Sequence, residues 1–282
     1  MADTGSPRAD AESDFLRARR QQVLGAVAGR FRADGEDERS LLSFDDVVAA
    51  LGRRGEQRLG LLVIPLDRVV GSVDRTQEFD RRFRPTSNRS RARWERIARA
   101  MRRGEEIPPI EVYKLGDLYF VRDGHHRVSV AKSLGLDVTE ADVTEILTKL
   151  SPVGLTGRGD LERKHWRRIF LERVPLTGEA RASIEVGNPD RYHRLAEMVE
   201  AWSARRMHAE GRYLTRAEAA DLWYREEYLP VLDLIATVGL ALPYETSTDT
   251  YFRVACERYE LTREHTWDAD ALEELRGRRR RT

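Results

Sequence analysis

Residues 123–127 (Asp-Gly-His-His-Arg) put two imidazoles and a guanidinium directly after an aspartate and a glycine. Residues 118–121 are apolar or aromatic and predict a buried strand before this segment, and residues 128–134 predict a short helix after it. The first N–H groups of a helix have no partner within the helix, and they lie at the positive end of its dipole. Together with Arg127 they are suited to bind a phosphate, which Gly124 would allow to approach the backbone. A tight turn in which His125 and His126 bond the local backbone is the alternative.

Two residues of this segment could also take part in catalysis. His125 has the ordinary pKa of a general base at neutral pH, although a neighbouring phosphate would favour its imidazolium form and hence charge stabilisation. Asp123 could accept a proton or hold Mg²⁺, or it could simply cap the helix. A metal site on His125 and His126 is disfavoured because adjacent histidines point in different directions.

A family resemblance extends this interpretation. Residues 107–113 (Ile-Pro-Pro-Ile-Glu-Val-Tyr), the hairpin after them and the 123–127 turn resemble the core of the ParB/sulfiredoxin family, across about residues 60–146. In that family a comparable turn, Gly-Glu-Arg-Arg in the ParB branch and Gly-Cys-His-Arg in sulfiredoxins, holds nucleotide phosphates. His125 stands where sulfiredoxins have the catalytic cysteine, so sulfinic-acid repair is not expected. The ParB arginine pair is also absent, so a preference for CTP does not carry over.

The resemblance implies a nucleotide triphosphate, ATP or CTP, bound with Mg²⁺. Its phosphates would lie at Gly124, His125, His126 and Arg127. The ParB branch further implies association with DNA and a role in chromosome partitioning. We therefore expect a nucleotide and DNA as partners, and a second copy or another protein as a partner of the C-terminal half.

Residues 74–85 are charged and show no periodicity. A long polar segment inside a compact domain is often functional, and in the resembled family the segment after the first strand lies near the nucleotide. Asp74 and Arg75 are therefore further candidates for the phosphate site, with a solvated loop as the alternative.

A basic amphipathic helix is predicted after Ser87 or Ser90. Trp94, Ile97, Ala98 and Met101 form its apolar stripe, and seven arginines against Glu95 occupy the rest of residues 89–103. Such a face attracts phosphate backbones, although many charged faces are merely solvated. The candidates for nucleic-acid contact are the arginines 89, 93 and 96 (Arg89, Arg93, Arg96).

Composition excludes several classes of protein. The chain has 282 residues, 34% of them charged, a net charge of +1 and one cysteine. Cys256 therefore has no disulfide partner within the chain, and its apolar neighbours predict a buried thiol. No apolar run reaches the length of a membrane span, and residues 1–7 lack a secretory signal, so we expect a cytoplasmic protein. The other histidines are scattered singly without metal-ligand spacing, and no metal site is predicted.

The predicted fold class is α+β, a small mixed-sheet domain followed by an all-helical one. We expect a disordered tail (1–14), an N-terminal helical extension (15–58), the mixed-sheet domain (59–150), a helical domain (160–276) and a basic tail (277–282). The first helix should bury Leu16, Val23, Val27 and Phe31, and residues 61–66 should form a buried strand. Residues 223–231 of the C-terminal half resemble a helical domain of unknown function found behind ParB-like domains in actinobacteria, which implies no activity.

Three functions follow from these patterns. The first is a DNA-associated or regulatory nucleotide switch. The second is an enzyme of the same fold, a nucleotide triphosphatase or a phosphotransferase acting on a small molecule. The third is a protein-interaction scaffold in which the turn has lost its ligand.

Overall fold

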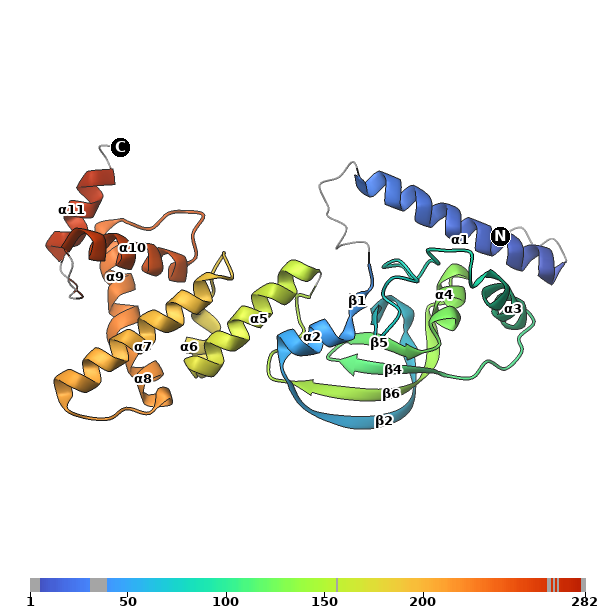
Figure 1. The fold of residues 1–282 in the computed structure, drawn as a ribbon, viewed down its shortest axis with the longest axis horizontal. Helices are drawn as coiled ribbons and strands as arrows, with labels where there is room; N and C mark the ends of the chain where they lie inside the picture. Colours follow the sequence, from blue (N-terminus) through green and yellow to red (C-terminus); the bar gives the residue numbers. More distant parts are fainter. Residues whose placement is uncertain are drawn as a thin grey trace. The chain divides into compact units, whose positions relative to one another are not determined.

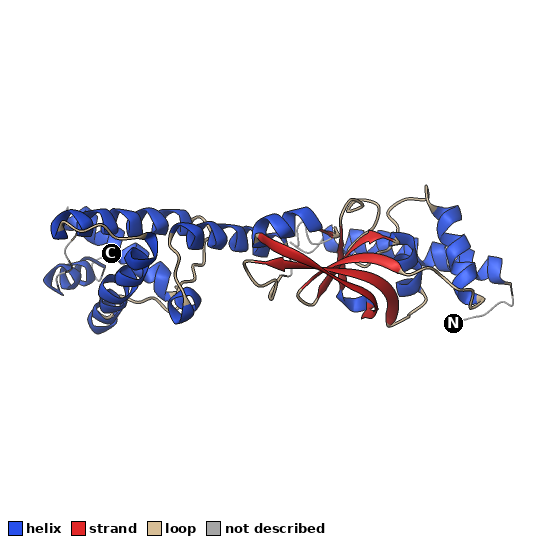
Figure 2. Ribbon diagram, turned by 90° about the horizontal axis from the view of Figure 1, so that it is seen from below, coloured by secondary structure: helices blue, strands red, loops and turns tan. Residues whose placement is uncertain are grey.

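The computed structural model describes residues 6–30, 40–155, 157–262, 265, 267 and 269–279. The chain divides into two compact units, residues 1–164 and 165–282, and the boundary lies inside helix α5 (Arg158–Arg173) (Figure 1). Unit 1 holds all the strands of the described residues, and unit 2 is helical (Figure 2). The predicted α+β class is therefore confirmed. In the described part of the chain no helix is long and apolar enough to cross a membrane.

Unit 1 is built on a mixed sheet. Its strand order is β1-β3-β5-β4-β6-β2, with six strands in the described residues. The predicted hairpin pairs β4 with β5 antiparallel, while β3 runs parallel to β5 and β6 runs parallel to β4. The strands are β1 (Leu42–Ser43), β2 (Arg53–Pro65), β3 (Val69–Ser72), β4 (Ile110–Leu115), β5 (Leu118–Asp123) and β6 (Val138–Thr148).

Successive side chains of β5 point to opposite faces of the sheet, and each face is covered by a different helix. Phe120 faces α2 (Phe44–Leu51), whose Phe44 ring lies 5.8 Å from it in an edge-on arrangement. The next residue, Val121, belongs to the opposite face and packs in one apolar core with Val128 of α4 (His125–Ser133). Because successive strand residues point to opposite faces, this register fixes where α4 can lie.

Strand β2 differs from the predicted buried strand. Only Ile64 of residues 61–64 is buried, whereas Leu61 and Val63 are 67% and 65% exposed. The reason is topological, because β2 lies at the edge of the sheet and pairs only with β6 there. An apolar run of this kind predicts a strand but not whether both faces of the strand are covered. The predicted helical extension (15–58) thus contains α1 and α2, but also β1 and the start of β2.

Helix α1 (Pro7–Arg30) packs on α3 (Arg91–Arg102) through Phe15 and Trp94, whose ring centroids are 5.5 Å apart. Residues 7–14, predicted to be disordered, belong to α1. The predicted stripe is wrong where it can be judged, because Leu16 and Val23 are exposed; the side chains of Val27 and Phe31 lie outside the described part of the chain. The buried face instead carries Ala11, Phe15 and Ala18 with two aspartates.

Unit 2 consists of short and medium helices. Thr215 and Glu218 form a capping box at the start of α8 (Arg216–Trp223). A π-helical turn, Tyr224–Tyr228, precedes Pro230. Cys256 is exposed rather than buried, and residues 277–279 of the predicted basic tail belong to α11. The helices after α5 are α6 (Gly178–Ser183), α7 (Arg191–Glu210), α8 (Arg216–Trp223), α9 (Leu229–Val238), α10 (Ser247–Thr262) and α11 (Ala269–Arg279).

Candidate functional site

The strand-to-helix turn lies where the sequence predicts it, and its glycine has a steric reason. Gly124 is the N-cap of α4, with φ 101°, a conformation that residues with a side chain rarely adopt. A Cβ at this position would lie 2.6 Å from Cγ2 of Ile110 in β4. Packing of α4 against the hairpin therefore already requires glycine here, without any ligand.

His125 and His126 lie inside the protein. Their exposed fractions are 4% and 5%, and the ring of Phe79 covers both, with centroid distances of 6.1 and 5.2 Å. Nε2 of His125 is hydrogen-bonded to the hydroxyl of Ser72 at 2.7 Å. Nδ1 of His126 is buried and has no hydrogen-bond partner in the described residues. The turn is thus closed by protein side chains.

Burial makes both imidazoles neutral at physiological pH. It lowers the pKa of His125 to about 4, against the opposing charge of Asp74. It also lowers the pKa of His126 to about 4, and the positive charge of Arg93 adds to the effect. The expected charge stabilisation by an imidazolium at His125 is therefore absent in this conformation.

Ser72, His125 and Asp74 do not form a catalytic triad. Oδ1 of Asp74 lies 3.9 Å from Nε2 of His125, which is the same nitrogen that contacts Ser72. A triad requires the acid at the other ring nitrogen, so that the base is oriented toward the nucleophile. The hydroxyl of Ser72 is fully buried and also accepts the backbone N–H of Arg75 at 2.9 Å. These contacts tie the loop after β3 to α4.

Arg127 is engaged by the protein. Its Nη1 donates to the carbonyl oxygens of Pro108 and Pro109 at 2.6 and 2.7 Å, and Nη2 is paired with Asp123. The guanidinium therefore joins α4 to the segment that enters β4. The same pairing engages Oδ2 of Asp123, a predicted candidate for proton transfer or Mg²⁺ binding, whose side chain is exposed.

The loop between β3 and α3 brings Arg75 and Asp74 beside the turn, and their charges act on the pKa of His125. Their role at a phosphate site stays a prediction. Farther along the loop, Asp80 accepts hydrogen bonds from the backbone N–H groups of Arg82 and Arg84 at 3.0 and 2.9 Å. Its second oxygen accepts Nε of Arg84 at 2.7 Å. Phe83 lies within this tight turn at φ 59°, with its ring buried. The bonds to Asp80 therefore stabilise the loop in this conformation.

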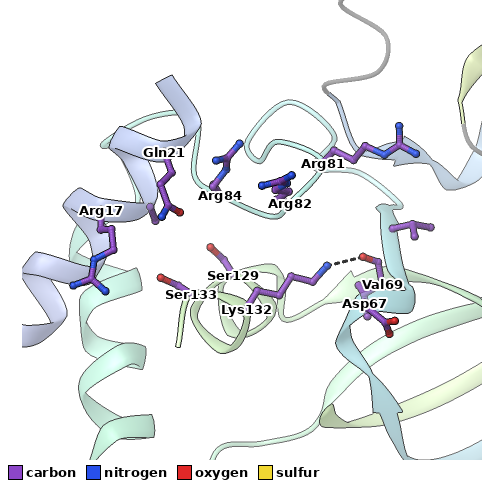
Figure 3. A pocket seen from close by; sticks show the side chains of 12 residues that line it. Arg17, Gln21, Asp67, Val69, Arg81, Arg82, Arg84, Ser129, Lys132 and Ser133 are labelled. Carbon is purple, nitrogen blue, oxygen red and sulfur yellow. Dashed lines mark hydrogen bonds between the residues drawn. The ribbon is translucent and has the colours of Figure 1, made fainter. Parts of the chain in front are cut away.

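A basic pocket lies on the neighbouring side of α4, between α1, this loop and β3. Its volume is about 870 Å³. Figure 3 shows the side chains that line it coming from separate segments of unit 1. Two serines of α4, Ser129 and Ser133, also line it. Five of the lining side chains are cationic and one is a carboxylate: Arg17, Arg81, Arg82, Arg84, Lys132 and Asp67.

Lys132 is a half-buried cation of the basic pocket. Its Nζ donates to the carbonyl oxygen of Val69 at 2.9 Å and lies 4.9 Å from the centroid of the Phe83 ring. Burial lowers the pKa of Lys132 to about 8, while the charges of Asp67 and Asp80 oppose the shift. An ammonium group has three donors, so one bond to Val69 leaves capacity for a ligand.

The predicted basic helix retains part of its positive surface. Arg89, Arg93 and Arg96 are exposed. Two other arginines are engaged by α1, since Arg91 is paired with Glu12 and Arg102 bonds the buried Asp14 at 2.6 Å. The three candidates for nucleic-acid contact therefore lie on a narrower basic surface than the sequence predicts.

Part of the basic pocket has a signal in the sequence. Residues 81–84 (Arg-Arg-Phe-Arg) lie in the charged segment 74–85, of which only Asp74 and Arg75 are predicted site residues. On α4, Ser129, Lys132 and Ser133 have the i, i+3, i+4 spacing of one helix face, a usable signal. No pattern indicates that α1 meets both segments, because this contact is long-range.

No metal centre is evident from the geometry of the described ranges. No group of three or more His, Cys, Asp or Glu residues is close enough there to hold a metal ion. The carboxylate of Asp67 lines the basic pocket and is exposed. A Mg²⁺ ion that arrives with a triphosphate typically needs only one or two protein carboxylates, so Asp67 fits that role.

Comparison with known proteins gives two weak structural likenesses. Sulfiredoxin from Arabidopsis thaliana is similar over 29% of this chain and 82% of its own, with 19% identity and a TM-score of 0.23. A Pnob8-like ParB-N domain is similar over 78% of this chain and 80% of its own, with 10% identity and a TM-score of 0.22. No protein-family model and no curated protein matches the sequence. Likenesses this weak carry no functional argument, so any proposal depends on the geometry of the site.

Proposed function

We propose that unit 1 binds a nucleotide or another phosphorylated ligand in the basic pocket beside α4. The observation that carries this proposal is the lining of one 870 Å³ cavity by five cationic side chains and a single carboxylate. Guanidinium and ammonium groups supply the charge-assisted hydrogen bonds that phosphate oxygens accept most strongly. The hydroxyls of Ser129 and Ser133 add neutral donors on the α4 side.

The basic pocket suits a phosphate better than the 123–127 turn in this conformation. At the turn the histidines are neutral and covered by Phe79, and Arg127 is bonded to Pro108, Pro109 and Asp123. In the basic pocket Arg82 is exposed, and Lys132 is charged below about pH 8. Binding at the turn would require the loop that carries Phe79 to move.

A nucleotide titration tests the proposal. Melting of the full chain is followed with ATP, CTP, GTP and ADP, each with Mg²⁺, and with inorganic triphosphate. A ligand present at 100 times its dissociation constant stabilises the folded state by about 2.7 kcal/mol. We expect a clear rise in melting temperature with at least one of the triphosphates, and no response to any of these compounds would contradict the proposal.

Variants locate the bound phosphates. Arg82→Gln removes an exposed guanidinium and keeps the backbone N–H bond to Asp80, so the loop should hold its shape. We expect it to weaken nucleotide binding about tenfold, as for loss of one charge-assisted hydrogen bond. Arg89→Gln, outside the basic pocket, is the control and should bind as the parent does. If Arg82→Gln binds the nucleotide normally and Arg127→Ala does not, the phosphates lie at the 123–127 turn instead.

A second candidate function, binding of nucleic acid, is favoured by the exposure of Arg89, Arg93 and Arg96 around α3. Affinity for duplex DNA should then fall steeply with salt concentration, and the slope should decrease when Arg93 and Arg96 are both changed to Gln. A flat salt response would exclude this function. Assays of phosphate release, with and without DNA, then separate a nucleotide switch from a triphosphatase or a phosphotransferase.

A further inference from the structure

Unit 2 contains a second cavity, separate from the basic pocket and of different chemistry. Its volume is about 210 Å³, and helices α7 and α10 contribute most of its lining. The α7 residues among them are Met198, Ala201, Trp202 and Arg205, whose i, i+3, i+4, i+7 spacing places them on one helix face. We call this space the aromatic cavity.

Ring side chains dominate the walls of the aromatic cavity. Trp202, Tyr251, Tyr259 and Trp267 all line it, together with His265, which stacks on Tyr259 at a centroid distance of 4.9 Å. For scale, an apolar cavity of about 150 Å³ is large enough for benzene. The aromatic cavity therefore has room for a single aromatic ring with a small substituent.

Among the described residues that line the aromatic cavity, two arginines stand against one carboxylate. Glu227 is its carboxylate in the described lining, and the indole N–H of Trp267 donates to Oε1 of Glu227 at 2.6 Å. Arg258 lies over the ring of Trp267, with its Cζ 4.0 Å from the centroid, and donates to the carbonyl oxygen of His265. Arg205 is exposed and also lines the cavity.

Local backbone geometry brings Glu227 into this cavity. The residue lies in the π-helical turn Tyr224–Tyr228, and single π-helical turns are frequent at functional sites. Burial raises the pKa of Glu227, against the hydrogen bond from Trp267 and the charges of Arg258 and Arg205. A carboxylate placed close to Glu227 would raise that pKa further, whereas the exposed guanidinium of Arg205 attracts an anion.

We propose that the aromatic cavity binds a small aromatic carboxylate, with the ring among Trp202, Tyr259 and Trp267 and the carboxylate on Arg205. The ring of the ligand fits the volume of the cavity and packs on its aromatic walls. The carboxylate of the ligand balances the excess positive charge of the described lining. A planar guanidinium is matched to a carboxylate through two parallel hydrogen bonds. This site is independent of phosphate binding in unit 1.

The single cysteine of the chain provides the readout. Cys256 lines the aromatic cavity and is exposed, so an uncharged maleimide can reach its thiol. Burial of part of the side chain raises the pKa of the Cys256 thiol, and maleimide reacts with the thiolate. Labelling is therefore measured at pH 8.5, by mass spectrometry of the full chain. We expect saturating benzoate to slow labelling at least fivefold and to change the tryptophan fluorescence at the same concentrations.

Charge and position are tested separately. Benzamide has the shape of benzoate without its charge and should bind at least tenfold more weakly. Arg205→Gln should weaken benzoate binding about tenfold, whereas Arg212→Gln, an exposed arginine outside the cavity, should leave it unchanged. Equal binding of benzamide and benzoate, unchanged binding by Arg205→Gln, or labelling of Cys256 unaffected by benzoate would each overturn the proposal.

Discussion

At the scale of single residues, substitutions at two glycines allow the cost of backbone strain to be measured separately from the cost of a steric clash. Gly124 and Gly135 flank α4, and both have positive φ, 101° and 76°. A Cβ on Gly124 would meet Ile110 at 2.6 Å, whereas a Cβ on Gly135 would find no atom within 4 Å. The pair therefore isolates the contact between α4 and the hairpin.

We expect Gly135→Ala to cost about 1 kcal/mol of unfolding free energy, from backbone strain alone. Gly124→Ala should cost about 1–3 kcal/mol more, because the added methyl group overpacks the site. Urea denaturation of both variants measures the difference. Equal losses would mean that Ile110 gives way freely.

The buried histidines make stability depend on pH in the acid range. Their pKa of about 4 in the folded state lies below the ordinary value near 6.5, so above pH 6.5 both states hold them neutral. As the pH falls from 6.5 toward 4 only the unfolded chain takes up the protons, and stability is lost, by about 3 kcal/mol for each imidazole.

Denaturation between pH 4.5 and 7.5 measures this loss. His125→Asn should flatten the pH profile by about half, whereas His208→Gln, a change at an exposed histidine, should leave it as it is. A parent protein whose stability does not change over this range would contradict the burial of the two rings.

Sequence reasoning located the residues of the turn but not their environment. Type and spacing were enough to place Gly124, His125 and Arg127 between a strand and a helix, and the structure agrees. The ring of Phe79 covers the imidazoles, and Ser72 bonds one of them. Both contacts depend on the course of the loop after β3, which no sequence periodicity predicts. For the same reason Arg127 was predicted to bind a ligand, and its hydrogen bonds to the carbonyl oxygens of Pro108 and Pro109 were not predicted.

At the scale of secondary-structure elements, Arg127 links α4 to the entrance of β4 through Pro108 and Pro109. We expect Arg127→Ala to lower the unfolding free energy by about 1–3 kcal/mol, as for loss of charge-assisted hydrogen bonds. Nucleotide affinity of the basic pocket should be unchanged. The surface pair of Arg122 and Glu111 provides a control, and Arg122→Ala should cost at most about 1 kcal/mol.

Elements with a clear period were predicted well. The apolar stripe of α3 depends on local periodicity, and Trp94 and Ala98 of that stripe are buried as predicted. Strand β2 and helix α1 were misjudged because their burial depends on distant partners. β2 lies at the sheet edge, and α1 turns Asp14 toward Arg102 of α3.

At the scale of the whole molecule, the proposed nucleotide site should respond to alkaline pH through Lys132. Its pKa of about 8 means that the ammonium loses its proton just above neutrality, and a bound phosphate gains less from the neutral amine. Nucleotide affinity should therefore fall as the pH rises through 8. Lys132→Arg keeps its charge at every accessible pH, so it should abolish this dependence in isothermal titrations between pH 7 and 9.5.

The two units offer two kinds of binding chemistry. Unit 1 has an open cavity of cations and hydroxyls, and unit 2 has a small cavity of rings with a few charges. A variant in one cavity can therefore serve as the control for ligand binding in the other. In the full chain, Arg82→Gln is the control for binding in the aromatic cavity, and Arg205→Gln is the control for binding in the basic pocket.

The pairing of α1 with α3 has a consequence for how much of the arginine-rich helix a polyanion can sense. Glu12 and Asp14 of α1 pair with Arg91 and Arg102 and neutralise part of their charge. These two arginines therefore attract a polyanion less strongly than unpaired arginines would. Removing the charge of the exposed Glu12 would leave Arg91 paired only with Glu95 and raise the affinity for any polyphosphate, without creating recognition. The buried Asp14 cannot be removed in the same way, because Arg102 would lose its partner inside the fold.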